Sequence, residues 1–438
     1  MKKIFIITAM AMILLSCAVK KEITTYTNST DISFNDSFTG NTMRFDFHHA
    51  GNSKEEMYYF DKVIREGAWA GSKVSLINPF DYGEQMFRII DLATGDVIYK
   101  NNYCTLFNEW QTTPEATSKD RSFPESVIFP EPKKDFIIEF HARNKASKVW
   151  EKKYTQTVKV DSYDIVPGKY LYESQDIHIG GNISNSLDIV LLPDGFTATE
   201  KEKFIDACQM WCDALFNYSP FSENRHRINI RAVWAPSMEK GIDKPGIGKW
   251  VNNLLDTRFY TFDSERYQMT EEFQKVRDIA ACAPYENIFI LTNTDKYGGG
   301  GIYNFYGLGS AGKTGYTGEV YVHEFGHSLM GLGDEYIELG NTVSALYPEG
   351  KEPWEANLTR FVKFEGKWEK EIAEGTPVPT PIVPGTTEKD WVIGAYEGGG
   401  YLEKGVYRGW PECMMKALTD FCPVCQKAIV KYLDYICK

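Results

Sequence analysis

The segment YVHEFGHSLMGLGDEY, residues 321–336, contains two histidines four positions apart, His323 and His327. Residues with this spacing lie on one face of an α-helix, so both imidazoles can bind the same metal ion. Glu324 follows the first histidine and can reach a water molecule on that metal without being a ligand. With only seven histidines in 438 residues, the pattern arises by chance in about one such chain in a hundred. The segment therefore predicts a helix that carries a metal site.

A third ligand must complete the site, because a hydrolytic zinc ion takes three protein ligands and keeps one position open. In metzincins, a Gly-x-x-His sequence after the second helical histidine turns the chain back to the metal. Gly331 and Asp334 keep that spacing, with one extra residue after His327 and an aspartate in the ligand position. Asp334 is our first choice, Glu335 is the alternative, and a more distant glutamate, as in other zincins, is the third candidate.

The segment as a whole predicts Zn²⁺ bound by His323, His327 and Asp334, with Glu324 as the catalytic base. Zinc lowers the pKa of a bound water molecule towards neutrality, and a neighbouring carboxylate can accept its proton. Whichever acid does not bind the metal can instead hold a histidine in the correct tautomer. The chemistry that these residues predict is hydrolysis by a metal-activated water molecule.

The first third of the chain has the pattern of an antiparallel β-sandwich, which we place at residues 18–160. His48 and His49 lie here on adjacent strand positions, so their side chains point to opposite faces, and we interpret them as surface or edge histidines. Two predicted strands flank the turn sequence at 93–96 and predict a hairpin. Short segments of alternating or apolar residues predict the strands: 43–48, 87–92, 97–99, 136–140 and 154–160.

A mixed α/β domain follows, which we place at residues 161–438, and the predicted fold is therefore multidomain α+β. Thr197 and Glu200 have the spacing of a capping box and predict a helix that ends near residue 217. Residues 366–398, rich in proline, glycine, threonine and glutamate, predict a long exposed loop. Apolar runs and helical patterns predict the other elements: strands at 187–192, 228–233 and 286–292, and a helix at 270–282.

The histidine segment resembles the bacterial IgA-peptidase family of zinc metallopeptidases. Leu-Leu-Pro-Asp-Gly-Phe at 191–196 and the Cys-Met-Met…Phe-Cys-Pro-Val-Cys sequence at 413–425 resemble this family too. The resemblance covers most of residues 20–438. It implies a β-sandwich followed by a zincin-like, metzincin-like catalytic domain, with the zinc ligands and catalytic glutamate given above. It also implies a protein or peptide substrate, with host proteins among the candidates, but it does not specify the target.

Residues 1–17 have the layout of a bacterial lipoprotein signal peptide, with two lysines, an apolar run from Ile4 to Leu15, and Ser16-Cys17. An ordinary signal peptide with an incidental cysteine is the alternative. The lipoprotein interpretation predicts a lipid on Cys17 and a place in the bacterial cell envelope, at the outer membrane or cell surface. We expect membrane contact only through this anchor. A net charge of −12 argues against a nucleic-acid partner, because such partners are bound mainly by lysine and arginine.

Eight cysteines remain, and some could form disulfides in an oxidising envelope, although the sequence does not show which. Cys422-Pro-Val-Cys425 is typical of a redox motif or of half a zinc knuckle. A second matching pair is absent, so we disfavour a redox role.

Three further features point towards the predicted active site. The sequence Trp-Pro-Glu-Cys-Met-Met at 410–415 predicts a methionine beneath the metal, as in metzincins, the alternative being two core methionines. The glycine-rich stretch 297–304 predicts either an edge strand that pairs with an extended substrate or a flexible connector. Tyr336 is one of several tyrosines that could donate a hydrogen bond to the developing oxyanion.

The sequence thus predicts an envelope-anchored zinc metallopeptidase, and an endopeptidase in particular. A competing hypothesis is an envelope lipoprotein that binds glycan or protein ligands and has a structural or vestigial metal site. The intact Glu324 argues against it, because a structural site needs no base. Two more hypotheses are a zinc hydrolase acting on a non-peptide bond and a thiol-redox protein.

Overall fold

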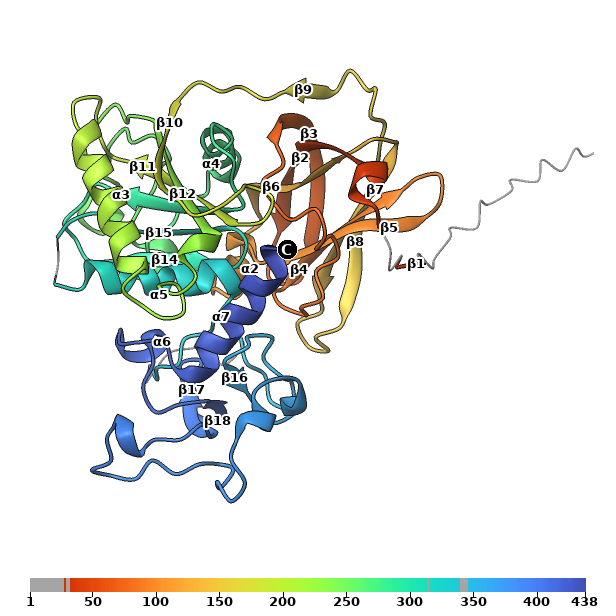
Figure 1. The fold of residues 1–438 in the computed structure, drawn as a ribbon. Coiled ribbons are helices and arrows are strands. Elements are labelled where there is room, and N and C mark those ends of the chain that lie inside the picture. Colours follow the sequence, from red (N-terminus) through yellow and green to blue (C-terminus); the bar gives the residue numbers. More distant parts are fainter. Residues whose placement is uncertain (1–26, 29–31, 314, 339–345) are drawn as a thin grey trace, which may run out of the picture.

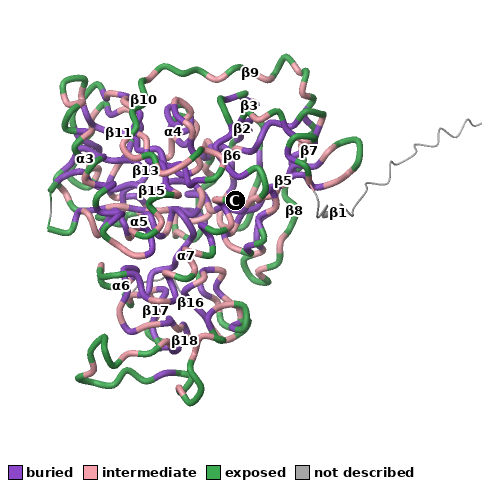
Figure 2. Tube along the Cα trace, viewed as in Figure 1, coloured by how far each residue is buried: buried purple, intermediate pink, exposed green. Residues whose placement is uncertain are grey.

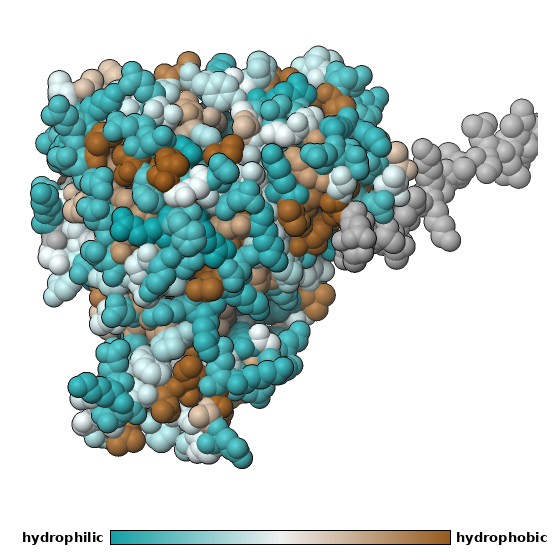
Figure 3. Space-filling view, in the orientation of Figure 1, coloured by the Kyte–Doolittle hydropathy of each residue, from teal (hydrophilic) through white to brown (hydrophobic). Residues whose placement is uncertain are grey.

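The computed structural model describes residues 27–28, 32–313, 315–338 and 346–438. The predicted lipoprotein signal at 1–17 lies outside these residues. Among the helices described, none has the length and apolar character needed to cross a membrane. The face of the molecule in Figure 3 is mostly hydrophilic, with hydrophobic groups scattered over it.

Two sheets face each other in the N-terminal region and confirm the predicted antiparallel sandwich (Figure 1). The short helix α1 (Phe34–Ser37) precedes β2. One sheet has, in spatial order, the strands β1 (Thr27–Asn28), β5 (Asp96–Tyr103), β4 (Gln85–Asp91), β7 (Phe136–Arg143) and β8 (Trp150–Val158). The other has β6 (Arg121–Pro132), β2 (Phe38–Gly51), β3 (Glu56–Ala68) and β9 (Ile165–Pro167).

The alternating pattern of β2 forms the core between these sheets. Phe45 and Phe47, two positions apart, lie on the same face of the strand. Their rings lie 5.8 and 4.7 Å from the ring of Phe140 on the opposite sheet. The parallel pairing of β9 with β3 adds residues 165–167 to this sheet, beyond residue 160, where we expected the domain to end.

His49 differs from our expectation, because it is fully buried and only His48 is exposed. The two side chains do point to opposite faces of β2. His49 Nδ1 lies 3.0 Å from Glu125 Oε2, and its Nε2 lies 2.9 Å from Glu56 Oε1. Burial by itself lowers the pKa of His49, but the charges and hydrogen bonds of Glu125 and Glu56 outweigh it and raise the pKa to about 9.

We predict that this raised pKa makes stability fall at alkaline pH. The protonated His49 stabilises the fold fully below pH 6.5, the ordinary pKa of histidine, and the contribution is lost as pH rises through about 9. The loss amounts to about 3 kcal/mol. Calorimetry of the full chain at pH 6 and pH 9 should show this drop, and His49→Gln should remove the pH dependence. The exposed neighbour provides the control, because His48→Gln should show the same pH dependence of stability as the wild type. An equal pH dependence in all three proteins would contradict the prediction.

A six-stranded mixed sheet is the centre of the second domain. Its central strands are parallel and its two edge strands run antiparallel to them. The predicted strands at 187–192, 228–233 and 286–292 are confirmed. In spatial order the strands are β10 (Glu173–Ile179), β12 (Ile228–Trp234), β11 (Leu187–Asp194), β13 (Asn287–Thr292), β15 (Tyr306–Ser310) and β14 (Gly299–Ile302).

Helices cover both faces of this sheet, which explains why β11 and β13 are buried along their whole length and apolar in their middle. The helices α3 (Lys201–Leu215) and α5 (Thr317–Met330) pack on one face. The helix α4 (Phe273–Ala280) covers the other and lies between the sheet and strand β6 of the sandwich. The helix α2 (Leu106–Trp110) comes from the N-terminal region but joins the same core as α4.

The predicted capping box forms only in part. The Glu200 carboxylate accepts a hydrogen bond from the Thr197 backbone N–H at 3.1 Å, as expected. The Thr197 hydroxyl, however, donates to the same carboxylate at 3.0 Å instead of accepting from the helix. The helix α3 therefore begins at Lys201, beyond the Thr197–Glu200 turn.

A smaller C-terminal part packs below α5 (Figure 1). Its three strands are, in spatial order, β16 (Leu358–Thr359), β18 (Leu402–Arg408) and β17 (Tyr396–Gly399). Most of the predicted loop at 366–398 is exposed and irregular, and only its end joins β17 (Figure 2). Two helices follow, α6 (Met414–Ala417) and α7 (Pro423–Ile436), and α7 runs back to the junction with the sandwich.

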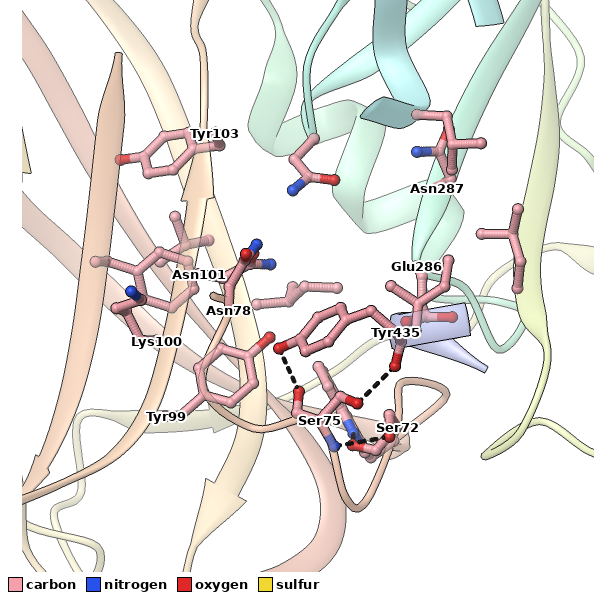
Figure 4. A pocket seen from close by; sticks show the side chains of 18 of the residues that line it. Ser72, Ser75, Asn78, Tyr99, Lys100, Asn101, Tyr103, Glu286, Asn287 and Tyr435 are labelled. Atoms are coloured by element: carbon pink, nitrogen blue, oxygen red, sulfur yellow. Dashed lines mark hydrogen bonds between the residues drawn. The ribbon is translucent and has the colours of Figure 1, made fainter. Parts of the chain in front are cut away.

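A small cavity of about 80 Å³ lies at that junction (Figure 4). Asn78, Asn101 and Glu286 contribute polar groups to its wall. The Tyr435 hydroxyl on α7 donates to the Ser75 carbonyl at 2.9 Å and fixes the helix against the sandwich. None of the predicted metal ligands lines this cavity, so it belongs to the domain junction and not to the predicted active site.

Candidate metal centre

The helix α5 carries the two histidines on one face, as the four-residue spacing predicts. The Nε2 atoms of His323 and His327 lie 3.1 Å apart. Each ring is oriented by a backbone carbonyl: His323 Nδ1 donates to Met414 O at 3.0 Å, and His327 Nδ1 donates to Leu332 O at 2.5 Å. Because a carbonyl can only accept, both Nδ1 atoms carry the proton in the neutral rings. Both Nε2 lone pairs are therefore free for a metal.

The helix ends at a glycine that the turn requires. Gly331 has a φ of +65°, and a Cβ atom at this position would lie 2.3 Å from the ring of Trp354. Its N–H donates to the His327 carbonyl at 2.9 Å. A left-handed residue at the helix end lets the chain reverse, and the following residues return to the histidines.

Asp334 is the acid that this turn brings to the histidines. Its Oδ1 lies 3.2 Å from His323 Nε2 and 3.3 Å from His327 Nε2. Glu335, our alternative, lies elsewhere: its Oε1 accepts a hydrogen bond from Asn357 at 2.8 Å. Within the described part of the chain, no distant glutamate joins His323, His327 and Asp334.

The three facing atoms fit a metal cation by their chemistry. In the neutral rings, two histidine lone pairs and a carboxylate oxygen face one another, and Asp334 Oδ1 is buried without a hydrogen-bond partner. Tetrahedral zinc with bonds near 2.0–2.1 Å separates its ligand atoms by about 3.3 Å. The observed 3.1–3.3 Å distances match this value.

When no metal is bound, the histidine nitrogens and the Asp334 carboxylate interact through protons instead. Burial by itself would raise the pKa of Asp334, but His327 and His323 outweigh it and lower this pKa. Burial would lower the pKa of His327, but Asp334 raises it to about 9. A metal and a proton therefore compete for the same lone pairs.

The centre is open to solvent, as a hydrolytic site must be. The side chains of His323 and His327 are 12% and 17% exposed, and Glu324 is also partly exposed. Burial raises the pKa of Glu324, and the two histidines oppose that rise. A carboxylate with a raised pKa is better suited to accept a proton from water near neutral pH.

The glycine-rich stretch is an edge strand, β14, and not a flexible connector. Its glycines have a role that we did not foresee, because they allow α5 to pack against the strand. A Cβ atom on Gly299 would lie 2.9 Å from the Glu324 side chain, and one on Gly301 would lie 2.3 Å from the Glu324 carbonyl. On its outer side, Gly299 O accepts from Gln268 N–H at 3.1 Å, so part of this edge is already paired.

The methionine segment lies against the helix α5. Met414 and Met415 are both fully buried. Met414 holds His323 through its carbonyl, and a Cβ atom on Gly326 of α5 would lie 3.0 Å from Met415 Sδ. The segment therefore supports the helix from below.

Sequence reasoning missed Tyr401, whose hydroxyl donates to Asp334 Oδ2. This residue lies 67 positions beyond the aspartate and has no motif of its own. Its ring packs edge-on against Tyr336 at 5.2 Å, so our oxyanion candidate is at the site too. Burial raises the pKa of Tyr336, with the Asp334 and Glu324 charges adding to the rise, so its hydroxyl stays protonated and can donate.

A second missed residue comes from the N-terminal region. Glu109 on α2 accepts a hydrogen bond from the Tyr267 hydroxyl. Burial raises the pKa of Glu109 to about 7, and the charges of His327 and Glu324 also act on it. Residues of the sandwich region therefore lie within electrostatic range of the metal centre.

The fold and this centre together define a zincin-like metallohydrolase, with a two-histidine helix packed beneath a mixed sheet that ends in an antiparallel edge strand. Residues 176–391 and 383–433 match the family model IgA Peptidase M64, and residues 33–155 match the model Peptidase M64 N-terminus. The chain belongs to the IgA Peptidase M64 family, a family of metallopeptidases. A comparison with curated proteins gave no match. The family and its two-part organisation confirm the resemblance found in the sequence.

We predict that Tyr401→Phe weakens metal binding. Losing the hydroxyl frees Asp334 Oδ2 and leaves the carboxylate less well oriented, a change that typically costs 10- to 100-fold in affinity. Competition with a chromogenic chelator would measure this. Tyr407→Phe serves as the control, because its hydroxyl faces Glu397 away from the centre. Equal metal affinity in Tyr401→Phe and the wild type would show that the hydrogen bond does not orient the ligand.

Proposed function

We propose that this protein is a zinc-dependent endopeptidase with the metal on His323, His327 and Asp334 and with Glu324 as the general base. The observation that carries the proposal is the group of three potential ligand atoms, 3.1–3.3 Å apart, beside a partly exposed glutamate. The family supports a peptide bond as the target. Zinc, when bound there, supplies Lewis-acid polarisation and makes water more acidic.

The residues of the chain have distinct roles in this proposal. Glu324 accepts a proton from the attacking water molecule and later delivers it to the leaving amine. The Tyr336 hydroxyl, in its neutral form, can donate to the oxyanion that develops on the substrate carbonyl. In this proposal the extended substrate backbone binds along β14 beyond Gly299, whose carbonyl is already bonded to Gln268. Such binding along a strand does not require a free chain end, which supports endopeptidase activity.

We predict that Glu324→Ala retains the metal but loses peptide hydrolysis. Glu324 is not a ligand, so elemental analysis should find the wild-type zinc content. Removing a general base should lower kcat by at least about 100-fold, measured with an unselective protein substrate such as casein. Chelation should abolish the wild-type activity, and zinc should restore it.

Glu319→Ala is the matched control, because Glu319 lies in the first turn of the same helix. It should cleave the substrate at the wild-type rate. Unchanged turnover in Glu324→Ala would refute the proposed base, and activity that survives complete removal of metal would refute the zinc mechanism.

We also propose that the mature protein is anchored in the bacterial envelope by a lipid on Cys17. The apolar run before Ser16-Cys17 supports this. We expect Cys17→Ser to move the protein from the membrane fraction to the soluble fraction of cells that express it. Co-fractionation of this variant with membranes would refute the lipid anchor.

A further inference from the structure

A second group of metal-binding side chains lies behind the active site. Cys413, Cys422, Cys425 and Glu335 are all buried, and their ligand atoms lie within 4.8 Å of one another. Cys413 precedes α6, and Cys422 and Cys425 lie at the start of α7. The Cys-Pro-Val-Cys sequence alone offers two ligands, and the fold brings Cys413 and Glu335 to it as the other two.

The distances within this group match a tetrahedral metal site. Zinc–thiolate bonds near 2.3 Å place two sulfur atoms about 3.8 Å apart, and a sulfur and a carboxylate oxygen about 3.5 Å apart. Cys413 Sγ and Cys425 Sγ lie 3.7 Å apart. Cys425 Sγ and Glu335 Oε1 lie 3.4 Å apart. A disulfide requires sulfur atoms about 2.05 Å apart and would leave one of the three cysteines unpaired.

Hydrogen bonds around the group favour thiolate sulfur. The Cys422 N–H donates to Cys413 Sγ at 3.3 Å, and the Cys425 N–H donates to Cys422 Sγ at 3.4 Å. Backbone N–H groups aimed at sulfur stabilise the anionic form. Such donors orient the ligands before a metal arrives.

The carboxylate in this group needs a cation. Glu335 is fully buried, and its Oε2 has no hydrogen-bond partner. Asn357 holds the other oxygen from outside the group at 2.8 Å. In the described part of the chain, no lysine or arginine forms a salt bridge with Glu335. Burial dominates and raises the pKa of Glu335 well above its ordinary value, although the charge of the buried Arg408 acts on this carboxylate in the opposite direction. A buried carboxylate that lacks a direct ion pair is costly, and a metal ion would neutralise it.

We propose that Cys413, Cys422, Cys425 and Glu335 bind a second, structural zinc ion. Four protein ligands close the coordination shell, which is typical of a structural site and leaves no position for substrate. This inference goes beyond the proposed peptidase activity, which needs only the first centre.

The second ion would fix the first centre in place. Glu335 directly follows the ligand Asp334, and Cys413 directly precedes Met414, whose carbonyl orients His323. The Glu335 N–H also donates to the Met415 carbonyl at 2.8 Å. One ion would therefore join the ligand turn after α5, the methionine segment and the first turn of α7.

Elemental analysis of the full chain tests the proposal. We expect two zinc ions per wild-type chain, and one in the double variant His323→Ala/His327→Ala. Cobalt substitution of that double variant should give a thiolate-to-metal charge-transfer band, because its remaining ion has sulfur ligands. Cys425→Ser should lose one ion and this band. Cys208→Ser, a fully buried cysteine in another part of the core, is the matched control and should keep two ions.

If Cys425→Ser does not fold, the double variant His323→Ala/His327→Ala still tests the proposal, because this double variant retains all three cysteines. A double variant without metal, or peptide mapping that finds a disulfide among Cys413, Cys422 and Cys425, would overturn the proposal. Failure of the proposed peptidase activity would give a different result: the double variant would keep its ion and the thiolate band, but the wild type would not cleave casein.

Discussion

The constraint on which the structure depends is that three potential ligand atoms must face one point. His323 Nε2, His327 Nε2 and Asp334 Oδ1 lie within 3.3 Å of one another. Lone pairs at this distance repel unless a proton or a metal cation lies between them, so the surrounding fold has to hold them. Backbone carbonyls fix both imidazoles, and Tyr401 fixes the second oxygen of the aspartate. These partners come from the turn after α5 and from two C-terminal segments, which explains why the C-terminal part packs beneath the helix.

The position of α5 depends in turn on the sheet above it. The glycines of β14 have no side chains, so the helix α5 can approach this edge strand directly at Glu324. A larger residue at Gly299 or Gly301 would collide with the helix. The opposite face of the sheet packs on α4, and Phe107 and Trp110 of α2 complete that core from the N-terminal region. The sandwich is therefore more than an appended binding module. It shares a hydrophobic core with the second domain and places Glu109 within electrostatic range of the candidate metal centre.

Local patterns predicted much of this architecture. The predicted parallel strands contain short apolar runs, and the sandwich strands alternate apolar and polar residues. The two histidines have helical spacing. Each of these patterns can be recognised within a few residues of sequence. The features that sequence reasoning missed depend on distant segments. Nothing local to His49 shows that Glu125 lies across the strand pair, and nothing near Asp334 indicates Tyr401. The choice between Asp334 and Glu335 is similar: both are carboxylates at acceptable spacing, and only the path of the chain after Gly331 shows which one faces the histidines.

The adjacent acids illustrate how one short turn can serve two centres. Asp334 faces the histidines of α5, whereas Glu335 turns towards the cysteines of α6 and α7. Because the two residues share a peptide bond, a displacement of either carboxylate moves the other. If the second group binds zinc, that ion resists such displacement with bonds to segments about 80 and 90 residues away in sequence, whereas the proposed catalytic centre, with three protein ligands, would keep one position open. The turn would then be rigid on its buried side and reactive on its exposed side, a division of roles that an isolated two-histidine helix cannot provide.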